Sequence, residues 1–216
     1  MSELKNLAAI RREYNGELID ENQLAADPVI QFQLWLSAAL VDAQYDVTAM
    51  VCATVDASGF PDARIVLLKG IENGGFVFYT NYKSVKATQL EQQPYAALNF
   101  YWPNMARQVR IRGTIKRTTA SQSDEYFYSR PLNSQINALI SPQSQKISNR
   151  EELEVLFEHA LTDYADNHNL QRPEHWGGYV VMPYEMEFWQ GCSNRLHDRI
   201  QYICINEVWQ HQRLAP

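Results

Sequence analysis

The chain has little cysteine and no long apolar run. Three cysteines occur in 216 residues, Cys52, Cys192 and Cys204, and they are too few and odd in number for a disulfide framework. No segment approaches the ~20 apolar residues needed to span a bilayer. The N-terminal residues lack the apolar run of a signal peptide. These absences predict a protein of the reducing cytoplasm that is not inserted in a membrane.

Motifs for metals and for common hydrolytic chemistry are also absent. The five histidines are widely spaced, and none combines with a Cys-x-x-Cys pair, so no metal site is expected. The chain has no Ser-His-Asp nucleophile motif, Walker loop or G-x-G-x-x-G fingerprint. Its formal net charge of -6 argues against a surface built for nucleic acid or anionic membrane. Any anion must therefore be bound by local clusters of cations.

What the chain does contain is a series of short β-like runs separated by turns. Hydrophobic residues at 45% and charged residues at 20% are ordinary for a globular protein. The runs are rich in β-branched and aromatic residues, which predicts antiparallel strands in a barrel or sandwich. The expected strands are 48–55, 63–68, 76–80, 95–101, 108–115, 177–182, 185–190, 199–205 and 208–213.

Helices are expected around these strands, at 27–42, 84–92, 121–129 and from 148 onward, with a short helix or arm at 4–14. The helix at 27–42 is expected to bury one stripe of residues, Ile30, Leu34, Trp35, Ala38 and Leu40. Ser148 and Glu151 have the spacing of a capping box. The polar stretch 130–147 is expected to be a loop. No repeat or linker divides the chain, so the prediction is one domain, mainly β with flanking helices (α+β).

One stretch near the C-terminus concentrates cationic groups. Arg195, His197 and Arg199 alternate with Leu196 and Asp198. The aromatic and β-branched residues on both sides favour an extended segment. In it the period of two would put the three nitrogen-bearing side chains on one face and make an anion site. The same pattern is typical of a solvated strand edge that carries charge for solubility. The stretch alone leaves both interpretations open.

Two further segments offer cations. Arg64 and Lys69 stand five apart around four aliphatic residues, so in a regular strand they face opposite ways unless a bulge intervenes. A core strand whose charged ends reach solvent is the alternative. Lys83 and Lys86 flank Ser84 at a predicted helix start, where N–H groups and the helix dipole favour phosphate. A solvated turn is the alternative there.

The next polar segment contains a phenol, a guanidinium and a hydroxyl that are spaced four residues apart. Tyr126, Arg130 and Ser134 could converge on a phosphate, although Pro131 prevents them from forming one helix face, and a solvated loop is the alternative. Gln108 could bond to a polar ring edge. One phosphate needs roughly two to three charge-assisted partners. This inventory therefore favours two phosphates, one on a cofactor and one on a substrate.

Several long motifs carry a resemblance to a known family. They occur in order along nearly the whole chain: Arg64-Ile65-Val66-Leu67-Leu68-Lys69, Tyr79-Thr80-Asn81, Arg107-Gln108-Val109, Tyr126-Phe127-Tyr128-Ser129-Arg130-Pro131, Ser134-Gln135-Ile136, Trp176-Gly177-Gly178, Glu187-Phe188-Trp189-Gln190-Gly191, Arg195-Leu196-His197-Asp198-Arg199 and Arg213-Leu214-Ala215-Pro216. Together they closely resemble the pyridoxine/pyridoxamine 5′-phosphate oxidase family.

The resemblance implies a fold, a cofactor and a reaction. The fold would be an FMN-binding split β-barrel, and the molecule a homodimer with FMN between the subunits. The reaction would remove a hydride from C4′ of pyridoxine or pyridoxamine 5′-phosphate, reduce FMN at N5 and pass the electrons to O2 as H2O2. Pyridoxal 5′-phosphate would be the product, in vitamin B6 salvage and biosynthesis.

The resemblance also assigns residues. FMN would be bound by Arg64, Ile65, Val66, Leu67, Leu68, Lys69, Tyr79, Thr80, Lys86, Gln108, Gln143, Ser144, Trp189 and Arg199. The substrate phosphate would be bound by Lys69, Tyr126, Arg130 and Ser134. Arg195, Leu196 and His197 would face the pyridine ring, with Arg195 and His197 as the catalytic pair. Arg11, Arg12, Glu13 and Tyr14 would bind substrate as a lid.

The chain departs from the family pattern at two positions. Val85 stands where some members have an arginine that contacts the FMN phosphate, and Leu132 replaces a basic residue. Cys192-Ser193-Asn194 carries no assigned role. Two other functions stay open: another FMN split-barrel oxidoreductase, and a protein that binds a flavin or pyridoxal phosphate without catalysis.

Overall fold

The computed structural model describes residues 6–41, 45–164 and 170–216. They divide into two compact units. Unit 1 takes its described residues from Met1–Val47, Asn99–Ile111 and Tyr184–Pro216, and unit 2 takes its own from Thr48–Leu98 and Arg112–Pro183. Within the described residues, no helix is long and apolar enough to cross a membrane.

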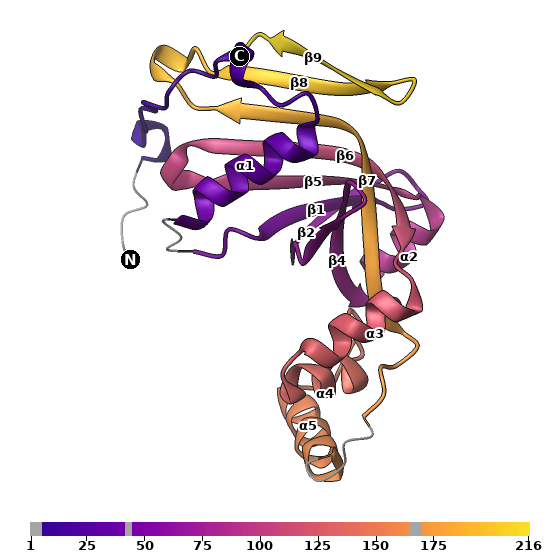
Figure 1. Ribbon diagram of the computed structural model, residues 1–216. Coiled ribbons are helices and arrows are strands. Elements are labelled where there is room, and N and C mark those ends of the chain that lie inside the picture. Colours follow the sequence, from indigo (N-terminus) through magenta and orange to yellow (C-terminus); the bar gives the residue numbers. More distant parts are fainter. Residues whose placement is uncertain (1–5, 42–44, 165–169) are drawn as a thin grey trace. The chain divides into compact units, whose positions relative to one another are not determined.

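Antiparallel strands form most of the regular structure (Figure 1). The strand order is β2-β1-β5-β6-β7-β4-β3, with β8 paired to β7 and β9 paired to β8. The strands are β1 (Ala49–Val55), β2 (Pro61–Leu67), β3 (Gly70–Glu72), β4 (Gly75–Asn81), β5 (Tyr95–Trp102), β6 (Arg107–Arg117), β7 (Trp176–Gln190), β8 (Asp198–Ile205) and β9 (Val208–Leu214).

Each predicted strand run is present, with two differences. A short β3 was not predicted, and the two runs expected at 177–182 and 185–190 form the single strand β7. The sequence suggests a break because Pro183 cannot donate a ladder hydrogen bond, yet the strand continues through it. Burial alternates along β5 and β6, as the period of two requires.

The helices are the 3-10 helices η1 (Leu7–Ala9), η2 (Glu21–Gln23), η3 (Pro103–Met105) and η4 (Ser193–Arg195), and the α-helices α1 (Pro28–Val41), α2 (Val85–Gln92), α3 (Ala120–Ser129), α4 (Leu132–Ile140) and α5 (Arg150–Tyr164). The expected N-terminal helix is reduced to η1, and residues 4 and 5 lie outside the described part. The predicted end of α1 at residue 42 also lies outside it. Helix α4 was expected to be loop.

The core of unit 1 forms where α1 packs on aromatic strand residues. The Phe32 ring lies 4.9 Å from Phe100, and Trp35 meets Phe188 edge to face at 5.2 Å. The predicted stripe was wrong for four of its five members: Ile30 is 51% exposed, Leu34 is 56% exposed, and Ala38 and Leu40 are exposed as well. Trp35 is buried, as predicted. Apolar residues occur on both faces of α1, so periodicity alone could not show which face is buried.

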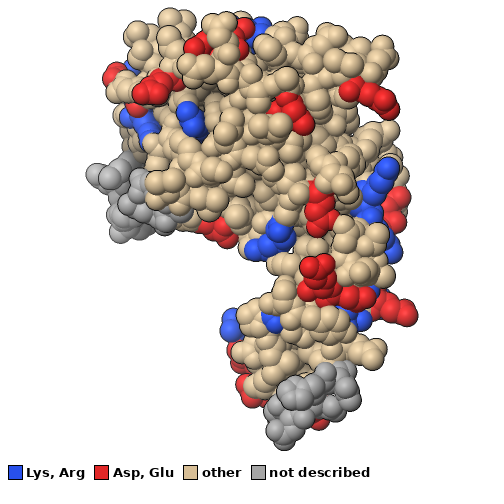
Figure 2. Space-filling model, in the orientation of Figure 1, with Lys and Arg blue, Asp and Glu red and all other residues tan. Residues whose placement is uncertain are grey.

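Unit 2 combines strands β1 to β4 with a cluster of helices. Figure 1 shows α3, α4 and α5 gathered together, and Phe127, Ile136 and Ala160 are among the buried residues of their shared core. Helix α2 begins after Ser84, whose hydroxyl accepts from an amide in the first turn, as predicted. On the face shown in Figure 2, acidic and basic side chains are interspersed.

Candidate active site

Unit 2 contains a cavity of about 470 Å³ that we call the cation-lined cavity. This volume is in the range of cofactor and small-molecule sites. Among the described residues four cations line it and no carboxylate does. The cavity therefore suits a ligand with several negative charges. Its lining is Arg64, Ile65, Val66, Leu67, Lys69, Tyr79, Thr80, Lys86, Tyr126, Arg130, Ser134, Gln143 and Trp176.

Arg64 is oriented in this cavity by a hydrogen-bond network. It lies on β2 opposite Cys52, and its Nη1 donates to the Thr54 hydroxyl at 2.6 Å and to the Cys52 carbonyl at 3.1 Å. Its Nη2 forms an ion pair with Asp62 and donates to Gln89 Oε1 at 3.2 Å. Residues of β1, β2 and α2 thus fix the guanidinium before any ligand binds.

Lys69 lines the same cavity as Arg64, although a regular strand would turn the two to opposite faces. After β2 ends, the Leu68 amide donates to the Thr48 carbonyl at 2.9 Å. The Lys69 amide then donates to the Val77 carbonyl at 2.8 Å. The backbone changes its pairing partner between these two residues, and this change resets the alternation of side chains.

Lys86 lies in the first turn of α2, where its ammonium meets only uncharged oxygens. Its Nζ donates to the Thr80 hydroxyl at 3.2 Å and to Gln143 Oε1 at 2.9 Å. Burial, and then the nearby Arg64 charge, lower the pKa of Lys86. The charged form is therefore held at a cost that an anionic ligand would offset.

One wall of the cavity is aromatic. Tyr79 stacks on Tyr126 with ring centroids 4.0 Å apart, and on Trp176 at 5.5 Å. Gly178 stands opposite Tyr79 in the β4–β7 pair, and a Cβ there would lie 2.8 Å from the Tyr79 ring. The glycine therefore leaves room for this ring. Burial, with the Glu72 charge adding to it, raises the pKa of Tyr79 to about 12, so its phenol stays protonated near neutrality.

Arg130 follows the end of α3 and is the C-cap residue. Its Nη1 is buried without a hydrogen-bond partner among the described residues, and burial lowers its pKa. A buried guanidinium nitrogen without an acceptor is costly unless a ligand supplies one. The cavity thus fits a phosphorylated ligand, and it brings Tyr126, Arg130 and Ser134 together as predicted.

The Arg195-to-Arg199 stretch is not the extended strand that was predicted. Arg195 ends η4, and strand β8 begins only at Asp198. Asn194 and Arg195 have φ of 56° and 60°, which is a left-handed conformation and not a strand. The expected alternation therefore fails before Asp198. Even so, Arg195 and His197 line one cavity.

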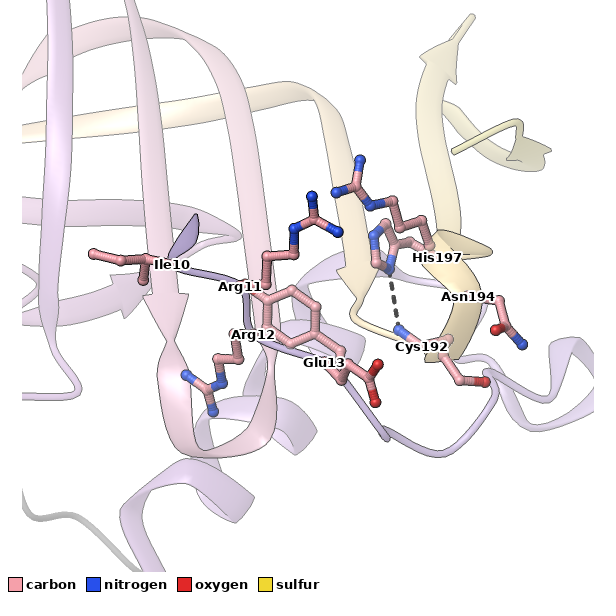
Figure 3. Close-up of a pocket in the computed structure, with 10 residues that line it drawn as sticks. Ile10, Arg11, Arg12, Glu13, Cys192, Asn194 and His197 are labelled. Carbon is pink, nitrogen blue, oxygen red and sulfur yellow. Dashed lines mark hydrogen bonds between the residues drawn. The ribbon is translucent and has the colours of Figure 1, made fainter. Parts of the chain in front are cut away.

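That cavity belongs to unit 1, has a volume of about 650 Å³, and is named here the N-terminal cavity. Figure 3 shows residues 10–13 on one side and the loop from Cys192 to His197 on the other. The predicted lid and the predicted catalytic pair are thus brought together within this unit. The lining is Ile10, Arg11, Arg12, Glu13, Tyr14, Cys192, Ser193, Asn194, Arg195 and His197.

His197 is fixed by one hydrogen bond and two rings. The Cys192 amide donates to its Nδ1 at 3.1 Å (Figure 3). The ring lies 4.9 Å from Trp189 and 5.7 Å from Tyr14. Because Nδ1 accepts, the proton of the neutral ring is on Nε2. His197 can therefore present an Nε2–H donor to a ligand.

Arg199 is engaged by the protein itself. Its Nε and Nη2 donate to the two oxygens of Glu187 at 2.9 and 3.1 Å, and Arg110 donates to the same carboxylate at 3.1 Å. The bonds to Glu187 raise the pKa of Arg199. Trp189, opposite Arg199 in the β7–β8 pair, is the other flavin-binding residue predicted in this part of unit 1.

The remaining predicted residues lie outside these two cavities. Leu68 is buried, and Gln108 is partly buried on β6. Ser144 is exposed, with a left-handed φ of 68°. Leu196 lines a different cavity of unit 1, together with Arg213 and the C-terminal residues. Val85 is the first residue of α2 and is 48% exposed.

Residue-level reasoning missed two features of the cavities. Trp176 lines the cation-lined cavity, yet no role was predicted for it beyond membership of a motif. Cys192 lines the N-terminal cavity and orients His197 through its backbone amide. Such a bond does not depend on the side chain, so no residue type could have revealed it.

Comparisons with known proteins agree with this geometry. Residues 37–162 match the family model described as pyridoxamine 5′-phosphate oxidase, and residues 176–216 match the pyridoxine 5′-phosphate oxidase C-terminal dimerisation region. The chain is 53% identical over 216 residues to the pyridoxine/pyridoxamine 5′-phosphate oxidase of Legionella pneumophila (strain Paris), covering 100% of both. It is 47% identical to that of Cytophaga hutchinsonii, covering 98% of this chain and 99% of the relative.

Solved structures share the fold. PhzG from Burkholderia lata 383, solved with tetrahydrophenazine-1-carboxylic acid, aligns with a TM-score of 0.87 at 26% identity, over 94% of this chain and 100% of that one. A pyridoxamine 5′-phosphate oxidase-related, FMN binding protein from Nostoc punctiforme PCC 73102 aligns with a TM-score of 0.68 at 17% identity. The alignment covers 93% of this chain and 100% of that one. The expected fold class, a mainly β split barrel with flanking helices, is confirmed.

The family models and the full-length relatives agree on one assignment. Together the two models cover residues 37–162 and 176–216, and the identities extend over nearly the whole length of each relative. Both findings confirm the resemblance carried by the motifs. The chain belongs to the pyridoxine/pyridoxamine 5′-phosphate oxidase family.

Proposed function

We propose that the chain is an FMN-dependent oxidase that converts pyridoxine 5′-phosphate and pyridoxamine 5′-phosphate to pyridoxal 5′-phosphate. The names of its relatives support these substrates, and family membership supports FMN. With pyridoxine 5′-phosphate, O2 takes two electrons and two protons and leaves as H2O2. With the amine, water also enters and ammonia leaves.

The cation-lined cavity is the observation that carries this proposal. Among the residues that the structure describes, it is lined by four cations and no carboxylate, and the Nη1 of one guanidinium is buried without a hydrogen-bond partner. Two phosphates together need about four to six charge-assisted partners. A ligand without phosphate would leave the buried Arg130 Nη1 without an acceptor, which argues against an unrelated substrate.

The residues then have separate roles. FMN, when bound, supplies the redox chemistry. Arg64, Lys86 and their polar neighbours bind the phosphorylated cofactor, while Lys69 and Arg130 bind the substrate phosphate. Arg195 and His197 orient the pyridine ring and stabilise charge that develops on it, with His197 donating from Nε2.

We also propose that the working molecule is a homodimer of the cytoplasm, with FMN at the subunit interface. The match of residues 176–216 to a dimerisation region supports the dimer. So do the exposed apolar side chains of Ile30 and Leu34 in α1. They stand four residues apart and are therefore neighbours on the helix surface, and adjoining exposed apolar side chains are typical of an interface. Small B6 vitamers and O2 are the partners, and neither nucleic acid nor membrane is expected to bind.

An aerobic turnover assay tests the function. Purified protein loaded with FMN is mixed with pyridoxamine 5′-phosphate in air, and pyridoxal 5′-phosphate and peroxide are measured. Equal amounts of the two products are expected. A yellow protein that binds the substrate but consumes no oxygen would instead be a binding protein. Turnover of another electron donor alone would indicate a different split-barrel oxidoreductase.

A further inference from the structure

Arg130 is held by an aromatic ring rather than by an acid. Its guanidinium carbon lies 4.6 Å from the centroid of the Trp176 ring. In the described part of the chain, no carboxylate lines the cavity that the two residues share. A cation over a ring face is stabilised by the ring quadrupole, and this contact uses none of the N–H donors. The charge of Arg130 therefore stays available to a ligand.

Trp176 is itself firmly placed. It is the first residue of β7, opposite Asn81 of β4, and only 6% of it is exposed. Its ring is nearly parallel to Tyr79, at 13°, and the edge-to-face contact with Phe127 is at 5.5 Å. Its carbonyl accepts from Arg172 Nη1 at 2.6 Å. The ring is thus a fixed platform for the Arg130 guanidinium.

We propose that Trp176 is a positioning residue for phosphate recognition: its ring face holds the Arg130 guanidinium in place and leaves the N–H donors for the phosphate of the substrate. The inference deepens the proposed function and rests on it. An acidic partner would orient the arginine equally well, but it would compete with the phosphate for the same donors. Only the ring supplies orientation without that competition.

The test compares a phosphorylated ligand with its unphosphorylated counterpart. FMN-loaded wild type, W176L and W176F are titrated by calorimetry with pyridoxal 5′-phosphate and with pyridoxal, and FMN content is checked in each. The measure is the ratio of the two dissociation constants. Loss of a desolvated cation–π contact predicts that W176L reduces the preference for the phosphate about tenfold. W176F keeps a weaker ring face and should be intermediate.

Trp35 provides a matched control in unit 1. It is also 6% exposed, and the Arg107 guanidinium carbon lies 4.4 Å from its ring centroid. W35L removes the same type of contact between two residues that do not line the cation-lined cavity, so it should lower stability and leave the ligand ratio unchanged. If either leucine variant fails to fold, W176F is compared with W35F, and the smaller ring should lower the ratio only at position 176.

One result would overturn the inference: a W176L protein whose ratio of dissociation constants matches the wild type, whether it binds both ligands as the wild type does or weakens both equally. Failure of the proposed function gives a different result. In that case the wild type would prefer pyridoxal 5′-phosphate over pyridoxal and lose that preference in W176L, yet would not turn over pyridoxamine 5′-phosphate.

Discussion

The cations of the cation-lined cavity differ in what holds them. Arg64 is neutralised in part by Asp62, Lys86 meets uncharged oxygens, and Arg130 lies over an indole. Only Arg64 among these three has an acidic partner lying beside it. The folded protein therefore keeps positive charge in a partly buried place, which lowers its stability and favours binding of anions.

Lys86 allows a test of whether partly buried positive charge lowers the stability of the protein while it favours anion binding. Burial and the Arg64 charge lower its pKa, so at neutral pH the folded state holds an ammonium that it disfavours relative to the unfolded chain. K86M should raise the Tm of the FMN-free protein by a few degrees. The same change should weaken FMN binding roughly tenfold or more, because a charge-assisted hydrogen bond is lost. Calorimetry measures both quantities.

Lys83 supplies the control for that experiment, because its side chain is exposed just before α2. K83M should change neither Tm nor FMN affinity appreciably. If K86M were less stable than the wild type and bound FMN equally well, the ammonium would be a structural group and not part of a phosphate site.

At this scale the chemistry of the site was more predictable than its geometry. The residue types of Arg64, Lys69 and Arg130 indicated a phosphate site, and they do line one cavity. The predictions of which side chains share a face of a strand failed, because they assumed regular strands. Lys69 follows a change of pairing partner, and Arg195 adopts a left-handed φ. Long-range contacts fix such backbone features, so local sequence does not show them.

Helix α5 shows how a cap can be predicted to within one residue and still be misplaced. The sequence suggested Ser148 with Glu151. In the structure the Asn149 side chain accepts from the Glu152 amide at 2.9 Å, and the Glu152 carboxylate accepts from the Ser148 amide at 2.9 Å. The cap is therefore Asn149 at the start of α5.

Substitution of the two candidate caps distinguishes these assignments. N149A should reduce the free energy of unfolding by about 1 kcal/mol, the usual effect of removing an N-cap acceptor. S148A should have little effect, since its amide and not its hydroxyl makes the bond. Urea unfolding together with hydrogen exchange of the α5 amides measures both. A larger loss in S148A than in N149A would contradict the structure.

The predictable elements were those with a clear period. Alternation indicated β5 and β6, and Ser84 indicated the start of α2. Helix α4 was missed because Asn133, Ser134 and Asn137 favour caps and turns, while Ile136 and Ala138 provide its buried contacts. Tertiary packing, not local propensity, stabilises this helix.

At the scale of the whole molecule, buried tyrosines link stability to alkaline pH. Burial raises the pKa of Tyr202 to about 12, as it does for Tyr79. The Tyr202 hydroxyl donates to the Ala25 carbonyl at 2.9 Å. The unfolded chain releases these protons near pH ~10. The contribution of the two protonated phenols to stability is complete below pH ~10 and is lost as the pH rises toward about 12.

Removing one such phenol should make the stability of the protein less dependent on pH in the alkaline range. Y202F loses a hydrogen bond, so it should be about 1 kcal/mol less stable near neutrality. Its stability should fall less steeply than that of the wild type above pH ~10. Urea unfolding at a series of pH values measures this, and parallel curves for the two proteins would show that Tyr202 does not contribute to the alkaline loss.

The class of the whole fold followed from composition and period, and the motif order identified the family. The division into two compact units could not be predicted from the sequence, because β5, β6 and β7 each contribute residues to both units. A boundary that crosses continuous strands leaves no linker in the sequence. The pairing order of the strands depends on long-range contacts and was also beyond local patterns.

The central claim is that this chain oxidises phosphorylated B6 vitamers and recognises them by their phosphate. The most direct test is to measure kcat/KM of the FMN-loaded protein for pyridoxine 5′-phosphate and for pyridoxine in the same aerobic assay. Loss of two charge-assisted contacts predicts a preference for the phosphate ester of roughly a hundredfold or more. Equal values for the two substrates, or no formation of aldehyde and peroxide from either, would contradict the account.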